Sequence, residues 1–260
     1  MCVAIDYTQS NGNLDNPNSL HAMNANNQYH MAIASVGGIV EPYDATKMFP
    51  TFGFGGIPRH MGAQGVSHCF SLNGNPGNPN IFGIANILQT YQQTLAQIAL
   101  SGPTYFGDII EAFVQYTQQS AGQTKYNVLL LLTDGVIHDM PRTKELIVAA
   151  SALPCSIIIV GVGNADFTMM EELDSDDSLL RAPSGKVASR DIVQFVQFNE
   201  CMKKGNLAEQ VLMEVPEQVS GYCNQVGWKA NKVGTQMNKG LGGMFQNAMQ
   251  GVVAQQPQQQ

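Results

Sequence analysis

Two continuous apolar runs constrain the fold of this chain more than any other feature of the sequence. They read YNVLLLLTDG at residues 126–135 and CSIIIVGVG at residues 155–163. Neither run approaches the roughly 18 apolar residues of a membrane-spanning helix, and neither alternates like a strand with one face in water. Such runs are typical of parallel strands covered on both faces, so the sequence predicts a sheet between two layers of helices.

Further predicted strands and helices alternate with these two runs. Short apolar stretches predict strands at residues 2–5, 48–55 and 191–198. Apolar residues at helical spacing predict helices within residues 80–100, 105–120 and 141–153. Pro141 suits the first turn of the last of these helices. The expected fold class is α/β, with a doubly wound, mostly parallel central sheet flanked by helices on both faces.

Carboxylates and hydroxyls follow the ends of two predicted strands. The first strand ends at Asp6, and Thr8 and Ser10 follow it at intervals of two residues in the stretch AIDYTQSNG. Asp134 ends the long apolar run. Ligands of open α/β sheets bind beyond the carboxyl ends of the strands, where the strand order reverses. We therefore expect both carboxylates to project at the same edge of the sheet.

A further hydroxyl comes from the stretch SGPTYF, in which we expect Thr104 to start a helix. Two carboxylates and three hydroxyls form an all-oxygen set that suits Mg²⁺ or Mn²⁺ and, less tightly, Ca²⁺. So few formal negative charges leave such a cation in need of one more anionic ligand. The sequence predicts a metal site for adhesion rather than ion storage, formed by Asp6, Thr8, Ser10, Thr104 and Asp134.

These five residues also have plainer interpretations. Asp6, Thr8 and Ser10 would form an Asx-type turn that closes the first strand. Asp134 or Thr104 would cap the N-terminus of a helix.

Three other stretches are given structural rather than functional interpretations. ELDSDD at residues 172–177 lacks the glycine and the closing glutamate of a helix–loop–helix calcium site, so a solvated loop is expected. GVGNADF at residues 161–167 follows a late strand and lacks the third glycine of a dinucleotide-binding loop. His60, His68 and Cys69 lack clear zinc spacing and are expected to pack or to lie at the surface.

Charge and cysteine content exclude several functions. The chain of 260 residues has a net charge of -7, which argues against a nucleic-acid partner. Its five cysteines are widely spaced, odd in number and free of C-x-x-C pairs. We expect buried, reduced thiols in a cytoplasmic protein.

The composition changes after residue 228. Lysines then alternate with glycines and methionines, and the chain ends in QQPQQQ. We expect one α/β domain over residues 1–228 and a Gly/Gln-rich, disordered tail over residues 229–260. Trp228 and three lysines would suit a membrane-surface helix, but the glycines oppose a stable helix there.

The motifs and their order resemble a known family. D-x-T-x-S, the Thr104 loop and the T-D-G aspartate together resemble the metal-ion-dependent adhesion site (MIDAS) of von Willebrand factor A-type domains. From about residue 2 to about residue 225 the chain resembles the copine version of that domain. The stretches that carry this resemblance are AIDYTQSNG, YDATKMFPTFGFG, FSLNGNPGNP, LLTDGVIHDMPRTKE, LPCSIIIVGVGNADFTMMEELDSDD and RDIVQFVQF.

The resemblance implies a Rossmann-like von Willebrand factor A fold and a metal-dependent protein-interaction module that is not an enzyme. The implied partners are proteins with an exposed Asp or Glu, in signalling at cytoplasmic and plasma-membrane surfaces. Copines normally carry two calcium-dependent lipid-binding β-sandwich domains ahead of this one, which we expect this sequence to lack. Membrane association is therefore expected only if such domains or the basic tail contribute.

Two rival functions remain open. One is a Mg²⁺-dependent phosphatase that uses Asp6 as its nucleophile. Such enzymes need a second carboxylate two residues later as general acid, and the hydroxyl of Thr8 is far too weak an acid for that role. The other is calcium-dependent phospholipid binding by a full-length form.

Overall fold

Strands and helices alternate along most of the chain in this computed structural model, which describes residues 1–24, 27–120, 124–174, 178–205 and 207–228. Contacts divide the chain into two units, Met1–Ser220 and Gly221–Gln260. The first unit holds the sheet and is described below. The predicted tail at residues 229–260 lies outside the described residues, and the predicted boundary after residue 228 stays a prediction.

The strands and helices of the described residues have the following bounds. The strands are β1 Cys2–Asp6, β2 Met48–Phe54, β3 Gly56–Pro58, β4 Phe70–Ser71, β5 Asn80–Phe82, β6 Ile98–Leu100, β7 Asn127–Thr133, β8 Cys155–Gly161 and β9 Val193–Gln197. The α-helices are α1 Gln28–Val40, α2 Ile84–Leu95, α3 Gly107–Gln119, α4 Met140–Ala150, α5 Thr168–Asp174, α6 Phe198–Lys204, α7 Leu207–Val211 and α8 Val215–Val226. Short 3-10 helices cover Gln9–Asn11, Glu41–Tyr43 and Arg59–Met61.

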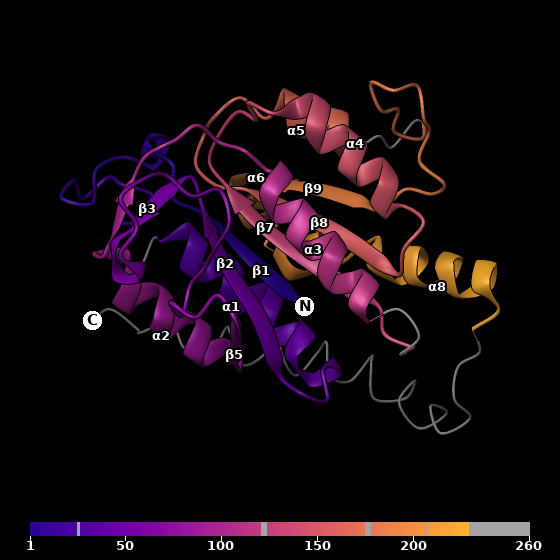
Figure 1. Cartoon of the computed structure of the whole chain (residues 1–260), viewed down its shortest axis with the longest axis horizontal. Coiled ribbons are helices and arrows are strands. Elements are labelled where there is room, and N and C mark those ends of the chain that lie inside the picture. The colour runs from indigo at the N-terminus through magenta and orange to yellow at the C-terminus, as the bar shows by residue number, and fades with distance from the viewer. Residues whose placement is uncertain (25–26, 121–123, 175–177, 206, 229–260) are drawn as a thin grey trace. The chain divides into compact units, whose positions relative to one another are not determined.

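The main sheet of the described residues has seven strands, in the order β4-β2-β1-β7-β8-β9, with β5 paired to β2 (Figure 1). Five strands of this sheet, β2, β1, β7, β8 and β9, are parallel, whereas β4 and β5 run antiparallel to β2. The chain starts in the middle of this sheet and then continues toward both edges. The strand order therefore reverses between β1 and β7, which is where an open α/β sheet places its ligands.

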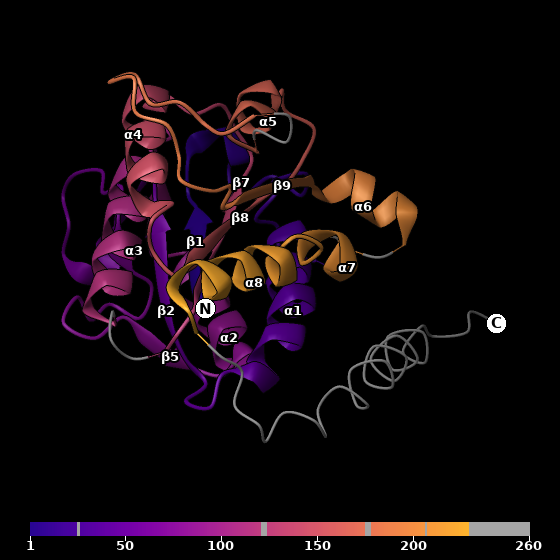
Figure 2. The same ribbon diagram turned by 90° about the vertical axis from the view of Figure 1, so that its right-hand side faces the viewer.

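Apolar side chains of the central strands alternate between two cores, one on each face of the sheet. In β7, Leu129 and Leu131 join the core that includes α3, α4 and α5. Leu130 and Leu132 join the core that includes α1, α2 and α7. Figure 2 shows α3 and α4 on one side of the sheet and α1 on the other. This arrangement confirms the predicted α/β fold class with helices on both faces.

Several predicted elements have different bounds in the structure. The predicted helix at 80–100 is shorter, because residues 80–82 pair with β2 and residues 98–100 pair with β3 as strands. Gly83 separates strand from helix with a φ of 73°. The helix expected to start at Thr104 starts at Gly107.

Two further segments were predicted wrongly or missed. Helix α1 was not predicted, since its sequence QYHMAIASVGGIV carries two adjacent glycines and a weak apolar stripe. The predicted solvated loop at residues 172–177 is wrong for its first half, because Glu172–Asp174 complete helix α5. Residues 175–177 lie outside the described residues.

The cysteines of this chain form no disulfide bonds. All five cysteines are free thiols, and Cys2, Cys155 and Cys201 are buried. None of the helices in the described ranges has the length and apolar character needed to cross a bilayer.

Gly53 of β2 lies where two aromatic rings meet the sheet. A Cβ atom added at this glycine would lie 2.3 Å from Cζ of Phe70 and 2.8 Å from Cε2 of Tyr7. The two rings also contact each other, with centroids 5.7 Å apart. Because Tyr7 follows Asp6 directly, the small size of Gly53 allows the chain beyond β1 to pack closely on β2.

We predict that Gly53→Ala destabilises the protein by about 1–3 kcal/mol, because the new methyl group overpacks this contact. Gly38→Ala is the matched control. Gly38 is exposed in α1, an added Cβ there meets nothing within 4 Å, and alanine should stabilise the helix by roughly 0.5–1 kcal/mol. Urea unfolding of both variants measures the two effects, and equal midpoints for them would contradict the proposed packing.

Candidate metal centre

The predicted carboxylates lie at the point where the strand order reverses. Asp6 is the last residue of β1, and Asp134 follows the last residue of β7. These two strands are parallel neighbours, with Ile5 opposite Leu132. Asp6 is fully buried and Asp134 is 4% exposed. The fold therefore brings both carboxylates to the same edge of the sheet, as the sequence predicts.

Both carboxylate oxygens of Asp6 accept hydrogen bonds. Oδ1 accepts from the backbone N–H of Thr8 at 2.7 Å and from its hydroxyl at 2.6 Å. Oδ2 accepts from the hydroxyl of Thr133, the last residue of β7, at 2.6 Å. The carboxylate of Asp6 thus ties the end of β1 to the end of β7.

The Asx-type turn considered as a plainer interpretation of this loop is present, but it is not distinctive. Asp44 with Thr46 and Asp166 with Thr168 form the same D-x-T turn, in which one carboxylate oxygen accepts from the backbone N–H and the hydroxyl of the threonine. Thr46 and Asp166 are exposed. What distinguishes the Asp6 turn is its burial and the further oxygen atoms that gather beside it.

The hydroxyls of Thr8 and Ser10 lie between the two carboxylates. The oxygen of Thr8 is 2.9 Å from the oxygen of Ser10 and 3.4 Å from Oδ1 of Asp134. Ser10 donates to the same Oδ1 atom at 2.9 Å. Ser10 is exposed while its neighbours in the site are buried, so the set opens to solvent on the side of Ser10.

Thr104 lies beside the site and comes from a third segment of the chain. Its backbone N–H donates to Nδ1 of His138 at 3.3 Å, and its carbonyl accepts from the backbone N–H of His138 at 2.9 Å. A Cβ atom built on Gly135 would lie 3.5 Å from the oxygen of Ser10 and 3.8 Å from the oxygen of Thr104. The Thr104 hydroxyl therefore lies on the same side of Gly135 as that of Ser10.

Neither helix-capping alternative holds in the structure. The N-cap of α4 is Asp139, not Asp134, and α3 has Phe106 rather than Thr104 at its N-cap. The carboxylate of Asp139 instead accepts from the backbone N–H groups of Phe106 and Gly107, at 3.0 and 2.8 Å. The side chain of Asp139, at the start of α4, thus accepts hydrogen bonds from two N–H groups at the start of α3. These bonds hold the Thr104 loop against the loop that contains Asp134.

Burial raises the pKa of both carboxyl groups. The pKa of Asp134 is raised to about 7 by burial, and the nearby charge of Asp6 acts in the same direction. Burial also raises the pKa of Asp6, although hydrogen bonds from Thr133 and Thr8 partly oppose the shift. None of the ion pairs found in the described ranges includes either residue. Two buried carboxylates without a basic partner favour a bound cation.

The spacing of the oxygen atoms fits a small divalent cation. Neighbouring ligands of an octahedral Mg²⁺ ion, with bonds of about 2.1 Å, lie about 3 Å apart. The oxygen atoms of Asp6, Thr8, Ser10 and Asp134 are separated by 2.6–3.4 Å where they contact one another. Within the described segments, no three His, Cys, Asp or Glu side chains group as a metal site. The four side chains offer only oxygen atoms, which are the ligands that hard cations prefer.

Buried residues behind the ligand loop were missed by sequence reasoning. The hydroxyl of Tyr29 donates to Oδ1 of Asn11 at 2.6 Å, and the amide of Asn11 donates to the carbonyl of Thr8 at 3.1 Å. Nε2 of His21 lies 2.8 Å from the carbonyl oxygen of Asp6. The contacts of His21 and Tyr29 join residues 15 and 18 positions apart in the sequence, and no local spacing marks them. Thr133 could have been found, since it directly precedes Asp134.

The other sequence candidates do not join the site. The ring of His60 packs edge-on against Phe70, with centroids 6.4 Å apart. The ring of His68 lies 4.6 Å from that of Tyr105. In the GVGNADF stretch, the backbone of Gly163 is bonded to the side chains of Gln28 and Asn199. These interactions are structural.

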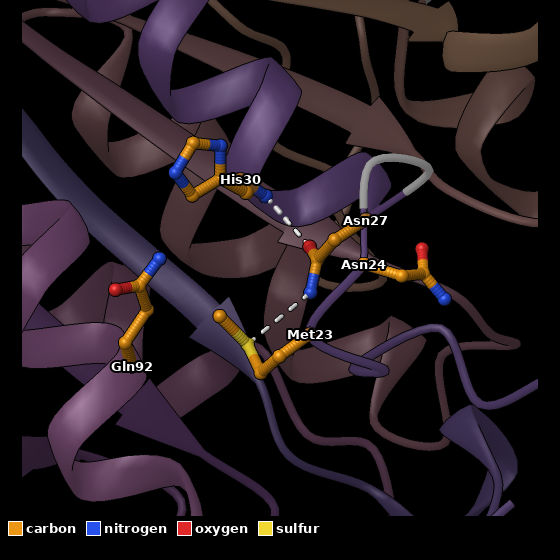
Figure 3. A pocket seen from close by; sticks show the side chains of 5 residues that line it. All are labelled: Met23, Asn24, Asn27, His30 and Gln92. Atoms are coloured by element: carbon orange, nitrogen blue, oxygen red, sulfur yellow. Dashed lines mark hydrogen bonds between the residues drawn. The ribbon is translucent and has the colours of Figure 1, made fainter. Parts of the chain in front are cut away.

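A separate shallow pocket lies at the N-terminal end of α1, with a volume of about 490 Å³ (Figure 3). Its lining residues are Met23, Asn24, Asn27, His30 and Gln92. Asn27 stands at its centre, where its carbonyl oxygen accepts from the backbone N–H of His30 at 2.8 Å and its amide donates to Sδ of Met23 at 3.7 Å. None of the five predicted metal ligands lines this pocket.

We predict that the metal-free protein loses stability as the pH rises from 6.5 to 8. A carboxyl whose pKa is higher in the folded than in the unfolded state stabilises the fold when protonated, and this contribution is lost as the pH rises through the folded pKa. Asp134, with a pKa of about 7, titrates in this window. Histidines whose pKa is lower in the folded state make the protein more stable as the pH rises, but only below about pH 6.5.

Thermal unfolding in the presence of a chelator measures this effect, with Asp134→Asn as the control variant. The variant should unfold at a higher temperature than the wild type at pH 8, and the difference should shrink toward pH 6. If the unfolding temperatures of the wild type and the variant differ by the same amount at pH 6 and at pH 8, Asp134 does not titrate between these two pH values.

Structural comparisons find similar proteins of low identity. The manganese-loaded TRAP protein of Plasmodium vivax matches over 78% of this chain and 69% of its own, with 14% identity and a TM-score of 0.48. Proximal thread matrix protein 1 from the mussel byssus, with a zinc-occupied MIDAS motif, matches over 82% and 44%, with 16% identity and a TM-score of 0.45. A von Willebrand factor type A protein from Catenulispora acidiphila matches over 84% and 42%, with 12% identity and a TM-score of 0.45. This chain spans less than half the length of the last two proteins.

Sequence comparison with protein families gives a match over most of the chain. The family model described as Copine matches residues 19–231. The matched range contains Thr104 and Asp134 and begins after the loop of Asp6, Thr8 and Ser10. The domain has a doubly wound, mostly parallel sheet, and the match over most of its length shows that the chain belongs to the copine family.

Proposed function

We propose that this chain is a metal-dependent protein-interaction domain. Asp6, Thr8, Ser10, Thr104 and Asp134 would hold a divalent cation, Mg²⁺ or Mn²⁺ in preference to Ca²⁺. The observation that carries the proposal is the convergence of four of these oxygen ligands from two sheet neighbours, at spacings of 2.6–3.4 Å. The two raised carboxyl pKa values support it, since a cation relieves the cost of burying both charges.

The proposed partner group is an exposed carboxylate of another protein. Three of the five predicted ligands are neutral hydroxyls, so a bound cation would keep much of its positive charge. An Asp or Glu side chain compensates this charge better than a neutral ligand. The site is open on the side of Ser10, which is exposed, and this opening is where a partner's side chain would enter.

We assign no enzymatic activity to the domain. A nucleophilic carboxylate needs an oxygen that can reach a substrate, yet Asp6 is fully buried and both of its oxygens accept hydrogen bonds. Thr8 occupies the position of the general acid that a phosphatase requires. Turnover of a generic phosphoester that is lost in Asp6→Asn would refute this assignment.

The cellular setting belongs to the same proposal. We place the domain in the cytoplasm, with membrane recruitment left to lipid-binding domains of the copine type or to the basic tail. Five free thiols are compatible with a reducing compartment.

We predict that Mg²⁺ or Mn²⁺ raises the thermal stability of the protein. A ligand present at about 100 times its dissociation constant adds roughly 2.7 kcal/mol to the free energy of unfolding. Asp134→Ala should abolish the rise, and Ser10→Ala should reduce it without disturbing the buried part of the site. Differential scanning fluorimetry across a metal titration measures both.

Asp166→Ala is the matched control for these variants. It removes the aspartate of an exposed D-x-T turn with the same local hydrogen bonds, so its metal response should equal that of the wild type. A full metal response in Asp134→Ala would show that the cation binds elsewhere.

We also predict that partner binding depends on the metal and on the hydroxyl of Thr104. When the immobilised protein is used to capture partner proteins from cytosol, a chelator should abolish the capture. Thr104→Ala should weaken capture at least several-fold, whereas Thr104→Ser, which keeps the hydroxyl, should behave like the wild type. Acid-to-amide substitution in the strongest partner identifies the carboxylate. Capture that is indifferent to chelator and to every partner carboxylate would refute the proposed mode of binding.

A further inference from the structure

The main chain of the ligand loop is held from behind by two buried side chains. Nε2 of His21 lies 2.8 Å from the carbonyl oxygen of Asp6. The amide of Asn11 donates to the carbonyl oxygen of Thr8 at 3.1 Å. His21 is 0% exposed and Asn11 is 2% exposed. The two carbonyls flank the peptide N–H of Thr8, which donates to Oδ1 of Asp6.

The positions of the protons around His21 follow from its partners. The carbonyl of Asp6 can only accept, so Nε2 of His21 carries the proton and donates it. In a neutral imidazole Nδ1 then accepts, and its partner is the hydroxyl of Tyr91 at 2.8 Å. The oxygen of Tyr91 in turn accepts from the amide of Asn27 at 3.2 Å. A directed chain of hydrogen bonds therefore runs from Asn27 through Tyr91 and His21 to Asp6.

Aromatic rings fix the plane of the imidazole. The ring of His21 stacks on that of Tyr29 at 4.5 Å with an interplanar angle of 16°, and on that of Tyr7 at 5.2 Å with an angle of 14°. Tyr29 belongs to α1 and Tyr91 to α2. The imidazole can therefore neither tilt nor slide without disturbing two helices, and its Nε2–H group keeps a fixed direction.

We infer that His21 is a positioning residue of the metal site. By fixing the carbonyl of Asp6, it orients the peptide unit between Asp6 and Tyr7 and so places the Thr8 N–H and hydroxyl against the Asp6 carboxylate. Asn11 likewise fixes the carbonyl of Thr8, two residues further along the loop, through its side-chain amide. This inference rests on the proposed metal site, and it adds two residues whose side chains contact the backbone carbonyls of Asp6 and Thr8 rather than the oxygen atoms that would bind the cation.

Substitutions of His21 can separate hydrogen bonding from packing. Glutamine places an amide nitrogen near the position of Nε2 and keeps the donor to Asp6, but it lacks the aromatic ring. Phenylalanine keeps the ring and its stacking between Tyr7 and Tyr29 but has no donor. Ile33→Ala is the control, because Ile33 is a buried residue of α1 whose aliphatic side chain takes part in none of these hydrogen bonds.

The first measurement is the affinity of the whole chain for Mn²⁺ or Mg²⁺, at a temperature where near-ultraviolet circular dichroism shows each variant folded. We expect His21→Phe to bind the metal at least ten-fold more weakly than the wild type. His21→Gln should lie within about three-fold of the wild type, and Ile33→Ala should match it. If His21→Phe binds as tightly as the wild type, or if Ile33→Ala binds as weakly as His21→Phe, the inference is wrong.

The second measurement needs no metal. Amide hydrogen exchange of Thr8, whose N–H donates to Asp6, reports the geometry of the loop, and the amide of Leu131 in β7 serves as an internal reference for global opening. His21→Phe should speed exchange at Thr8 at least ten-fold relative to Leu131, and His21→Gln should not. If the wild type binds no metal, the proposed function is refuted, but the role of His21 in holding the loop is not. Unchanged exchange at Thr8 in His21→Phe would refute the role of His21.

Discussion

The burial of two carboxylates at the boundary between β1 and β7 is the constraint on which the rest of the site depends. Asp6 and Asp134 lie beyond neighbouring parallel strands, and both carry raised pKa values because water is excluded around them. Every other feature of the site offsets part of that cost. Hydroxyl donors from Thr8, Thr133 and Ser10 contact the carboxylate oxygens. A cation would complete the compensation, which is why we assign metal binding to this edge.

The sequence was sufficient to predict the five parallel strands and the meeting of Asp6 and Asp134 at one edge of the sheet, but not the side chains that support them from behind. Continuous apolar runs identified β7 and β8 because strands covered on both faces leave no polar positions. The approach of the Asp6 and Asp134 carboxylates to each other was predictable because the ends of parallel strands share one edge of a sheet. The D-x-T spacing alone was not specific, since the turns at Asp44 and Asp166 have the same hydrogen bonds. The buried turn differs from these two in its burial, in the hydroxyl of Ser10 and in the second carboxylate, that of Asp134.

What could not be predicted depends on contacts through space or on competing local preferences. Helix α1 escaped prediction because Gly37 and Gly38 interrupt it, and Gly37 is explained only by the close approach of Ile84, whose Cδ1 would lie 2.6 Å from an added Cβ. The helix predicted across residues 80–100 is bounded by strand pairing at both ends, which overrides helical spacing. His21 gave no local signal, because its partners come from β1, α1 and α2.

The span of sequence that the site bridges also determines when it can form. The hydrogen bonds that join the loop of Asp6 to the end of β7 connect residues 124–127 positions apart. Contacts of such high sequence separation require closure of a long loop before they contribute any stability. On the ribosome, the first half of the chain emerges with its aspartate and hydroxyls in place but without their counterparts from β7. The proposed binding of a cation would therefore follow assembly of the sheet, and the site cannot guide the early steps of folding.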